Sequence, residues 1–376
     1  MLELDLDFLA PQYAAGSIAD VLPSVADGLG VPRSYDILGL GPAQRVIVLV
    51  IDGLGLRQLQ RHADVAPVLV GGLHRELTAV FPSTTAAALT SIGTGLSPGE
   101  HGIVGASFRF GDNQEVLRPL SWSHEPAPLS VQSEPTWWEQ SANAGVTVAA
   151  VSPRPYRHAG LTRVALGPGT YIGADGPGER IDAITAPLRS AGPGERVLVY
   201  GYWEWLDKTG HVQGPESVAF ARELAAADSF VAALLAATPA GTRILVTADH
   251  GLLGCPDIVD LDELSHFHQG VRLVAGEPRM RHLYCAPGAD RDVLQRSQDL
   301  LGSAAQVLTR DEAIATGWFG LVPADHQDRI GDVVLIARDR QRLAAHSRDR
   351  VISGLPGQHG SLTGEEMAVP LLQYDV

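Results

Sequence analysis

The chain has 376 residues, of which 45% are hydrophobic and 19% charged, so it can bury a large core and is not a disordered polymer. Its 28 Lys and Arg stand against 43 Asp and Glu, a net charge of −15. This acidic balance argues against binding to a nucleic-acid polymer, which needs a basic face. It also argues against a polybasic membrane anchor.

The N-terminal segment and the cysteines favour a cytoplasmic protein. Residues 1–7 alternate acidic and apolar side chains without a positive charge, unlike a secretory signal. The longest strongly apolar run, Val46 to Ile51, is far shorter than the roughly 20 residues of a membrane helix. Cys255 and Cys285 are too few for a secreted disulfide scaffold, and we interpret them as two ordinary buried thiols, with one disulfide between them as the alternative.

Short apolar runs that are bounded by turn residues predict buried strands. In chain order they are Val46–Ile51, Leu77–Phe81, Thr147–Val151, Arg196–Tyr200, Ile244–Thr247 and Val333–Ile336.

Helical periodicity fills segments between these strands. It is clearest from Pro215 to Ala237, where Pro215 and Glu216 supply the expected first turn. Because strands alternate with helices, the sequence predicts an α/β layered fold with a largely parallel sheet.

Two regions depart from this alternation. Residues 119–136 carry four prolines with Ser and Glu between them, which predicts a long surface connection. Residues 255–345, with short strands and a helical stretch around Arg291–Leu301, predict a smaller inserted lobe. The chain then returns to a short apolar end, Val369 to Leu372.

Polar clusters follow four of the predicted strands. Ligands of open α/β sheets bind beyond the carboxyl ends of the strands, so these clusters should meet at one edge. They are Asp52-Gly53, Pro82-Ser83-Thr84-Thr85, Asp207-Lys208-Thr209-Gly210-His211 and Asp249-His250-Gly251, and a fifth, Gly357-Gln358-His359-Gly360, lies near the C-terminus.

Each cluster taken alone also has a simpler interpretation. Asp52 could end a strand in a turn, and the i, i+4 pair Asp207 and His211 could lie on a solvated helix face. Asp249 could be a cap beside a packed His250. Turn statistics do not easily explain so many Asp and His residues at strand ends. Because both residue types ligate zinc and related divalent ions, the joint pattern predicts a metal site.

Thr85 is the candidate nucleophile. It precedes Ala86-Ala87-Ala88-Leu89, a good helix former, and the N–H groups of a helix N-terminus favour an anion. Ser and Thr are also preferred N-caps, so at least one of Ser83, Thr84 and Thr85 has only that role in the alternative interpretation. A threonine hydroxyl is a poor nucleophile without an activating base or metal, which the predicted ligands supply.

The ordered set of Asp52-Gly53, Thr85, Asp207-x3-His211, Asp249-His250-Gly251 and His359-Gly360 resembles the alkaline phosphatase superfamily. Within it, the chain is most similar to the type I phosphodiesterase / nucleotide pyrophosphatase family. The segment from Phe81-Pro82-Ser83-Thr84-Thr85 through Thr94-Gly95-Leu96 and Pro98 to His101-Gly102-Ile103 matches that family's nucleophile segment without a gap, and the resemblance extends over residues 45–372.

The resemblance implies an alkaline-phosphatase-like three-layer sandwich over residues 1–376, with the lobe at 255–345 inserted in it. It also implies two divalent metal ions, usually zinc. One would be held by Asp207, His211 and His359, and the other by Asp52, Asp249, His250 and the Thr85 hydroxyl.

The activity implied is hydrolysis of a phosphodiester or pyrophosphate bond in a small-molecule phosphate ester. Thr85 would attack phosphorus in line, and water would release the resulting phospho-threonine. A phosphomonoesterase or phosphonate hydrolase of the same superfamily is the alternative, and a metal-stabilised binding protein is the non-catalytic one. The three alanines after Thr85 are unlike the nucleophile segment of sulfatases. The sequence does not indicate which oligomeric state the protein has.

One position departs from the family. Nucleotide pyrophosphatases commonly have an Asn about twenty residues after the nucleophile, where this chain has Ala106, whose methyl group donates no hydrogen bond. Ser107 or a residue from elsewhere could substitute, or the substrate could differ. Tryptophans near the site either line a pocket for an aromatic group or belong to the core; they are Trp137, Trp138, Trp203 and Trp205.

Overall fold

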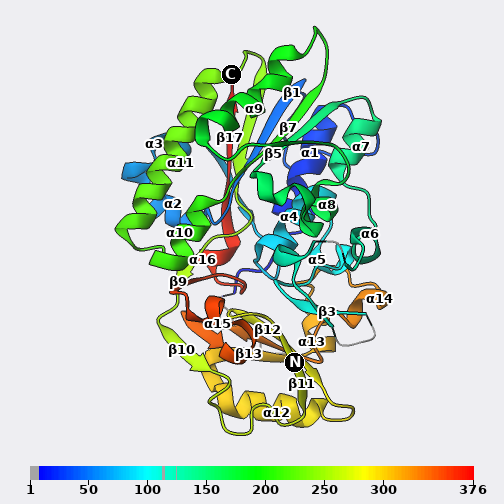
Figure 1. Ribbon diagram of the computed structural model, residues 1–376, viewed down its shortest axis with the longest axis vertical. Helices are drawn as coiled ribbons and strands as arrows, with labels where there is room; N and C mark the ends of the chain where they lie inside the picture. Colours follow the sequence, from blue (N-terminus) through cyan, green and yellow to red (C-terminus); the bar gives the residue numbers. More distant parts are fainter. Residues whose placement is uncertain (1–7, 112–114, 124) are drawn as a thin grey trace.

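The computed structural model describes residues 8–111, 115–123 and 125–376. Within these residues the main feature is a sheet of seven strands in the order β2-β17-β8-β1-β7-β5-β6, called here the large sheet (Figure 1). Its strands are β1 (Arg45–Ile51), β2 (Leu73–Thr78), β5 (Thr147–Ser152), β6 (Thr170–Gly173), β7 (Val197–Trp203), β8 (Thr242–Thr247) and β17 (Ala368–Asp375). The fold is the predicted α/β sandwich with a largely parallel central sheet.

The central strands of the large sheet are parallel, because β1 pairs in parallel with both β7 and β8. Every residue of β1 from Val46 to Ile51 is buried, as expected for a parallel strand that helices cover on both faces. Strand β17 is antiparallel to β8 and to β2, so β2 points in the same direction as β8. The predicted apolar end, Val369 to Leu372, is part of β17 and lies between β2 and β8 in the sheet.

Helices cover both faces of the large sheet (Figure 1). Helices α2, α3, α10 and α11 form one group, and α1, α4, α7 and α8 form the other. The helices are α1 (Val21–Gly28), α2 (Leu56–Arg61), α3 (Pro67–Gly71), α4 (Thr85–Thr94), α5 (Pro98–His101), α6 (Pro128–Val131), α7 (Trp137–Asn143), α8 (Gly160–Leu166), α9 (Pro177–Ser190), α10 (Trp205–Gln213), α11 (Val218–Ala237), α12 (Asp290–Leu301), α13 (Arg310–Ala315), α14 (Ala324–Gln327), α15 (His346–Gly354) and α16 (Gly364–Met367), with 3-10 turns η1 (Ile18–Asp20), η2 (Ala63–Val65), η3 (Pro119–Ser121), η4 (Arg154–His158) and η5 (Gly302–Ala304).

Three local predictions were wrong. Helix α11 begins at Val218 rather than at Pro215, because the Ser217 hydroxyl accepts a hydrogen bond from the Phe220 N–H and caps the helix. Strand β2 ends at Thr78, so the predicted strand Leu77–Phe81 is mostly a buried loop that leads to Pro82. The 119–136 connection is not entirely at the surface, since it contains η3 and α6 and buries Trp122.

A second sheet, called here the small sheet, has the strand order β11 (Val271–Glu277), β12 (Met280–Cys285), β14 (Val333–Ala337) and β13 (Ala305–Thr309) in the described part of the chain. The two faces of β14 serve different cores. Val334 and Ile336 belong to the main core, whereas Val333, Leu335 and Ala337 belong to a second core beneath α12. This alternation follows from the two-residue period of a strand, and it fastens the small sheet to the rest of the molecule.

The small sheet and its core fall within residues 255–345, for which the sequence predicts an inserted lobe; those boundaries stay a prediction. The remaining strands are β3 (Phe108–Phe110), β4 (Glu115–Leu117), β9 (Leu253–Gly254), β10 (Asp257–Asp260), β15 (Gln341–Ala344) and β16 (Gly357–Gln358).

Cys255 and Cys285 are both free thiols, so the disulfide alternative is excluded, although only Cys255 is fully buried. Among the described residues, no helix combines the length and the apolar character that crossing a membrane requires.

Candidate active site

The three middle strands of the large sheet deliver most of the predicted site. Asp52 follows β1, and Asp249 and His250 follow β8, its neighbour on one side. Helix α10, which carries Asp207 and His211, follows β7, its neighbour on the other side. Because these strands are parallel, their carboxyl ends meet at one edge, as the sequence predicts.

Asp52, Asp249 and His250 form a first triad, whose possible ligand atoms all lie within 4.8 Å of one another. Asp249 Oδ1 accepts hydrogen bonds from the N–H groups of Gly53 (3.1 Å) and His250 (3.0 Å). Asp52 Oδ2 accepts one from the Tyr202 hydroxyl. The other oxygens, Asp249 Oδ2 and Asp52 Oδ1, are buried without a hydrogen bond among the described residues, and they lie 3.5 and 3.6 Å from His250 Nε2.

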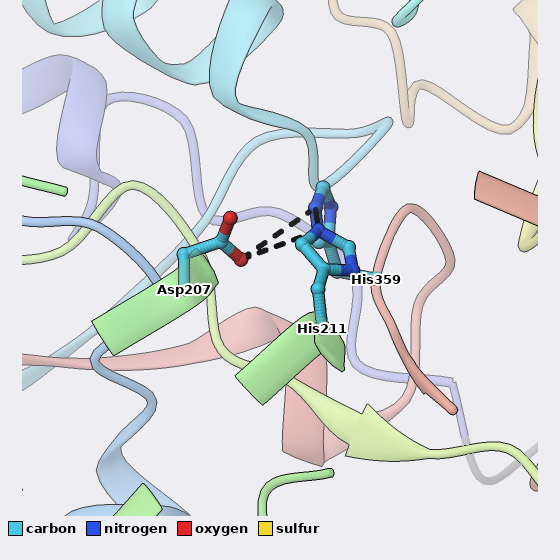
Figure 2. Close-up of side chains that lie close together, drawn as sticks. All are labelled: Asp207, His211 and His359. Atoms are coloured by element: carbon cyan, nitrogen blue, oxygen red, sulfur yellow. Dashed lines mark hydrogen bonds and ion pairs between the residues drawn. The ribbon is translucent and has the colours of Figure 1, made fainter. Parts of the chain in front are cut away.

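Asp207, His211 and His359 form a second triad under the same criterion of 4.8 Å (Figure 2). The i, i+4 spacing on α10 directs Asp207 and His211 to the same point, with 3.4 Å between Asp207 Oδ1 and His211 Nε2. His359 reaches it from the segment after β16, with 3.1 Å between its Nε2 and His211 Nε2. Asp207 Oδ1 is a further buried oxygen for which the described residues provide no hydrogen bond.

The three histidines have the orientation that metal ligands require. His211, His250 and His359 each place Nδ1 against a backbone carbonyl, at 2.7, 3.0 and 2.8 Å. A carbonyl only accepts, so Nδ1 carries the proton and Nε2 presents its lone pair to the triad. The two lone pairs of His211 and His359 then face each other, and a cation between them removes that repulsion.

Electrostatics also indicate cation sites. Burial, together with the nearby carboxylates of Asp249 and Asp207, raises the pKa of Asp52 well above its ordinary value. Burial, together with the nearby rings of His250 and His211, lowers the pKa of His359 well below its ordinary value. Three buried carboxylate oxygens without a hydrogen bond and three outward Nε2 atoms therefore fit two divalent ions of the zinc type.

Thr85 lies at the first triad. It is the first residue of α4, and Thr84 takes the cap position without a capping hydrogen bond from its side chain. Thr85 Oγ1 is 3.2 Å from His250 Nε2. The stacked rings of His250 and His359, with centroids 3.7 Å apart, place the two triads side by side. The cap interpretation of Thr85 does not hold, because its hydroxyl faces the candidate ligands.

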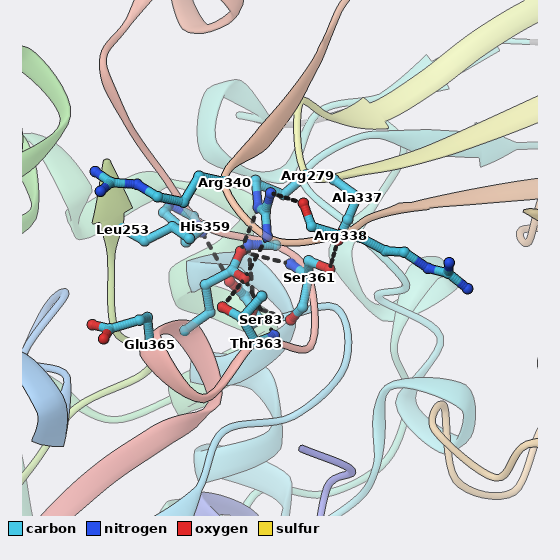
Figure 3. A network of polar contacts seen from close by, with 12 residues as sticks. Ser83, Leu253, Arg279, Ala337, Arg338, Arg340, His359, Ser361, Thr363 and Glu365 are labelled. Carbon is cyan, nitrogen blue, oxygen red and sulfur yellow. Dashed lines mark hydrogen bonds and ion pairs between the residues drawn. The ribbon is translucent and has the colours of Figure 1, made fainter. Parts of the chain in front are cut away.

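A buried polar network holds His359 against the Thr85 loop (Figure 3). The Ser83 carbonyl accepts from His359 Nδ1, and the Ser83 hydroxyl donates to the Ser361 carbonyl at 2.7 Å. Ser361 N–H donates to Glu366, which is paired at 3.0 Å with the fully buried Arg279 next to β12. The sequence analysis missed this network, because a lone Arg–Glu pair 87 residues apart leaves no local pattern.

Two glycines allow the elements that carry the site to pack closely against one another. Gly53 has φ +75°, and a Cβ there would lie 3.0 Å from Asp207 Cα. A Cβ on Gly357 would lie 2.1 Å from the Gly210 carbonyl oxygen. Glycine at these positions lets α10 approach the end of β1 and lets β16 carry His359 alongside α10.

A cavity of about 210 Å³ opens beside Thr85 and is here called the tyrosine cavity. It is mainly apolar, with Tyr156, Tyr200 and Tyr202 as its aromatic residues and Leu89 and Leu161 among the aliphatic ones. None of the four tryptophans named above lines it, and Trp137, Trp138 and Trp203 are buried in the main core. The core interpretation of these tryptophans is therefore the one that holds.

Ala106 lies where the family commonly has Asn, and Ser107 does not replace that amide. The Ser107 hydroxyl donates to the Gly276 carbonyl at 3.0 Å and accepts from the Gly276 N–H at 2.9 Å. Instead Glu277, at the end of β11, lines the same cavity wall as Thr84 and Ala106, and its Oε2 lies 3.9 Å from His359 Nδ1. Burial raises the pKa of Glu277 to about 8. The sequence analysis missed Glu277 because it comes from the small sheet.

The structure thus brings all seven predicted site residues to one edge of an α/β sandwich, as two triads of possible metal ligands beside a threonine. The sequence profile of the family described as type I phosphodiesterase / nucleotide pyrophosphatase matches residues 46–362. The chain belongs to that family, which makes it a phosphoester hydrolase in kind. No match to the chain is found among curated protein sequences.

Solved structures with the same fold include two kinds of protein. Murine ectonucleotide pyrophosphatase/phosphodiesterase 5, an inactive threonine-to-alanine variant in complex with AMP, is 21% identical with a TM-score of 0.67 over 88% of each chain. The human protein of that name is 18% identical, with a TM-score of 0.69 over 88% of each chain. Phosphonoacetate hydrolase from Sinorhizobium meliloti, in complex with phosphonoformate, is 22% identical, with a TM-score of 0.67 over 88% of this chain and 90% of its own.

Proposed function

We propose that the protein is a metal-dependent hydrolase that cleaves phosphodiester or pyrophosphate bonds of small molecules, with Thr85 as nucleophile. The observation that carries the proposal is the position of Thr85 Oγ1, 3.2 Å from His250 Nε2 and next to both triads. The inactive threonine-to-alanine relative in complex with AMP supports it.

The reaction follows from this geometry in two displacements. The Thr85 hydroxyl gives up its proton to solvent water, Oγ1 bonds to phosphorus, and the opposite bond from phosphorus to the leaving-group oxygen breaks, so that this oxygen leaves as an alcohol or phosphate that takes up a proton from water. A water molecule then attacks phosphorus, the bond from phosphorus to Oγ1 breaks, and Oγ1 regains a proton to restore Thr85. Two divalent ions, when bound by the triads, would supply positive charge that favours the threonine alkoxide and stabilises the attacking and leaving oxygens. The apolar tyrosine cavity accommodates an aryl, nucleobase or other apolar ester group.

Substitution of the nucleophile tests the proposal. Thr85→Ala should lower kcat for bis(p-nitrophenyl) phosphate on the order of 10³-fold or more, about 4 kcal/mol of lost transition-state stabilisation. Thr85→Ser keeps a hydroxyl and should retain more activity than the alanine variant. Thermal unfolding of both variants checks that the fold is intact. Normal turnover by Thr85→Ala would remove this residue from the mechanism.

We propose zinc for both ions, since the triads combine imidazole nitrogen with carboxylate oxygen, a donor set typical of zinc. Elemental analysis of the purified protein should give two zinc ions per chain. We also propose a cytoplasmic location, in keeping with the free thiols Cys255 and Cys285. Cell fractionation with an antibody to the protein checks it.

A phosphonate or phosphomonoester hydrolase is the second candidate. Ala106 at the usual Asn position and the likeness to phosphonoacetate hydrolase favour it. A comparison of the hydrolysis of matched phosphomonoesters and phosphodiesters distinguishes the two candidate functions. A monoester preference above about 100-fold, about 2.8 kcal/mol of differential transition-state binding, would favour the second candidate.

A further inference from the structure

A second cavity, of about 270 Å³, meets the tyrosine cavity at Thr85, Leu120 and Asp207. Its walls come from elements far apart in the sequence: the end of β11, the segment after β4 and helix α15. A phosphorus atom in front of Thr85 therefore has room for one substituent in the tyrosine cavity and for another in this second cavity.

The second cavity differs from the tyrosine cavity in charge. Arg118 and Arg348 line it, and across residues 8–111, 115–123 and 125–376 neither guanidinium forms an ion pair or a hydrogen bond. Asp349 in the same wall is already paired with the buried Arg281. In the tyrosine cavity, Lys208 is paired with Glu204 at 3.8 Å. The second cavity therefore has two uncompensated positive charges in a protein whose net charge is −15.

The acidic groups of the second cavity lie deeper than the arginines. Asp207 belongs to the second triad, and Glu277 is buried in the wall that also contains Thr84 and Ala106. Arg118 and Arg348 are both exposed, so they lie at the mouth. An anionic group would meet the arginines there, at a distance from the phosphorus that Thr85 attacks.

We propose that Arg118 and Arg348 bind a second anionic group of the substrate, such as a terminal phosphate or a carboxylate. The planar fork of a guanidinium matches both oxyanions with paired hydrogen bonds, and arginine is charged at every working pH. The substrate would then be unsymmetrical, with its second anionic group on the arginines and any apolar group in the tyrosine cavity. This inference rests on the proposed function and narrows its substrate class.

The test compares substrates with and without the second anion. Bis(p-nitrophenyl) phosphate has none, ATP offers a terminal phosphate, and phosphonoacetate offers a carboxylate. In the double variant Arg118→Gln/Arg348→Gln, we expect KM for at least one anionic substrate to rise about tenfold or more, as for charged hydrogen bonds. Which of the two loses affinity identifies the source of the anion. The kinetic constants for bis(p-nitrophenyl) phosphate should change less than about twofold.

Arg350→Gln is the matched control, because Arg350 is an exposed arginine on α15 that does not line the cavity. It should leave all three substrates unaffected. The inference is overturned if the double variant loses equal activity on all substrates, or keeps wild-type KM for both anionic ones. It is also overturned if the wild type hydrolyses bis(p-nitrophenyl) phosphate but neither anionic substrate. A wild type that hydrolyses no phosphoester at all would instead contradict the proposed function.

Discussion

The two triads differ in how the chain builds them. The first takes Asp52, Asp249 and His250 from the ends of two neighbouring strands, β1 and β8. The second takes two residues from one helical turn and a third, His359, from a segment 148 residues later. Backbone N–H groups hold Asp249 directly, whereas His359 depends on the network through Ser83, Ser361 and Glu366. The first triad is therefore a product of sheet topology, and the second depends on distant packing.

Removal of one carboxylate from either triad, in two separate variants, should have the largest effect on activity. Asp249→Asn and Asp207→Asn keep the side-chain shape but remove the charge, so each should lose one of two metal ions and lower kcat on the order of 10³-fold. Elemental analysis and turnover of bis(p-nitrophenyl) phosphate measure both quantities. If either variant loses both ions together, the triads are one cooperative site and the comparison between them fails.

Gly357→Ala should affect the second triad alone. The added methyl would lie 2.1 Å from the Gly210 carbonyl oxygen and would push β16, and with it His359, away from α10. We expect a fall in activity of about 10- to 100-fold, similar to that from mutated partners of metal ligands, and loss of the ion at the second triad. Gly354→Ala is the control, since a methyl group there has nothing within 4 Å. Equal metal content in the two variants would contradict the prediction.

Tyr202→Phe should weaken the first triad alone, because Asp52 Oδ2 then loses its hydrogen-bond donor. Removal of such a partner typically lowers metal affinity about 10-fold or somewhat more. Competition with a chelator measures that affinity. Tyr200→Phe, in the same strand and cavity, removes a hydroxyl that has no hydrogen bond within the described residues, and it should leave metal affinity unchanged.

The smallest expected effect is a difference between the triads in how their affinity for metal depends on pH. In the metal-free protein the raised pKa of Asp52 keeps a proton on the first triad to higher pH, so metal binding there must displace it and should strengthen as pH rises. The pKa of His359 is lowered, so this ring is already neutral near pH 7 and has no proton on Nε2 for a metal to displace. Titration with zinc between pH 6 and 8, in Asp207→Asn and in Asp249→Asn, isolates the two sites. Equal slopes would contradict the prediction.

The sequence predicted the first triad well for a physical reason. An apolar run such as Val46 to Ile51 identifies a parallel strand, and parallel strands bring their carboxyl ends to one edge, so Asp52, Asp249 and His250 could be placed together. For His359 the sequence alone gave only that its segment, near the C-terminus, could fold back to this edge, and the resemblance to a family assigned it to a metal. The short strand β16 that holds it has two residues, too few for a periodic pattern.

Other features of the site could not be predicted from local patterns. Tyr202 lies in a fully buried strand and has the sequence character of core, yet its hydroxyl bonds to Asp52. Glu277 ends a strand of the small sheet, and nothing in its neighbours indicates that it meets Thr84 and Ala106. The two cavities on either side of Thr85 exist only where separate elements meet.

The amino-acid sequence alone determined the family, the central sheet and the kinds of side chain available for the chemistry. These depend on residue type, order and short-range periodicity, which a linear chain displays directly. The tertiary structure decided which lone pairs face one another, which carboxylate oxygens lack hydrogen bonds and where arginines remain uncompensated. Those properties depend on distances between atoms that lie up to about three hundred residues apart, and packing of the whole chain sets them.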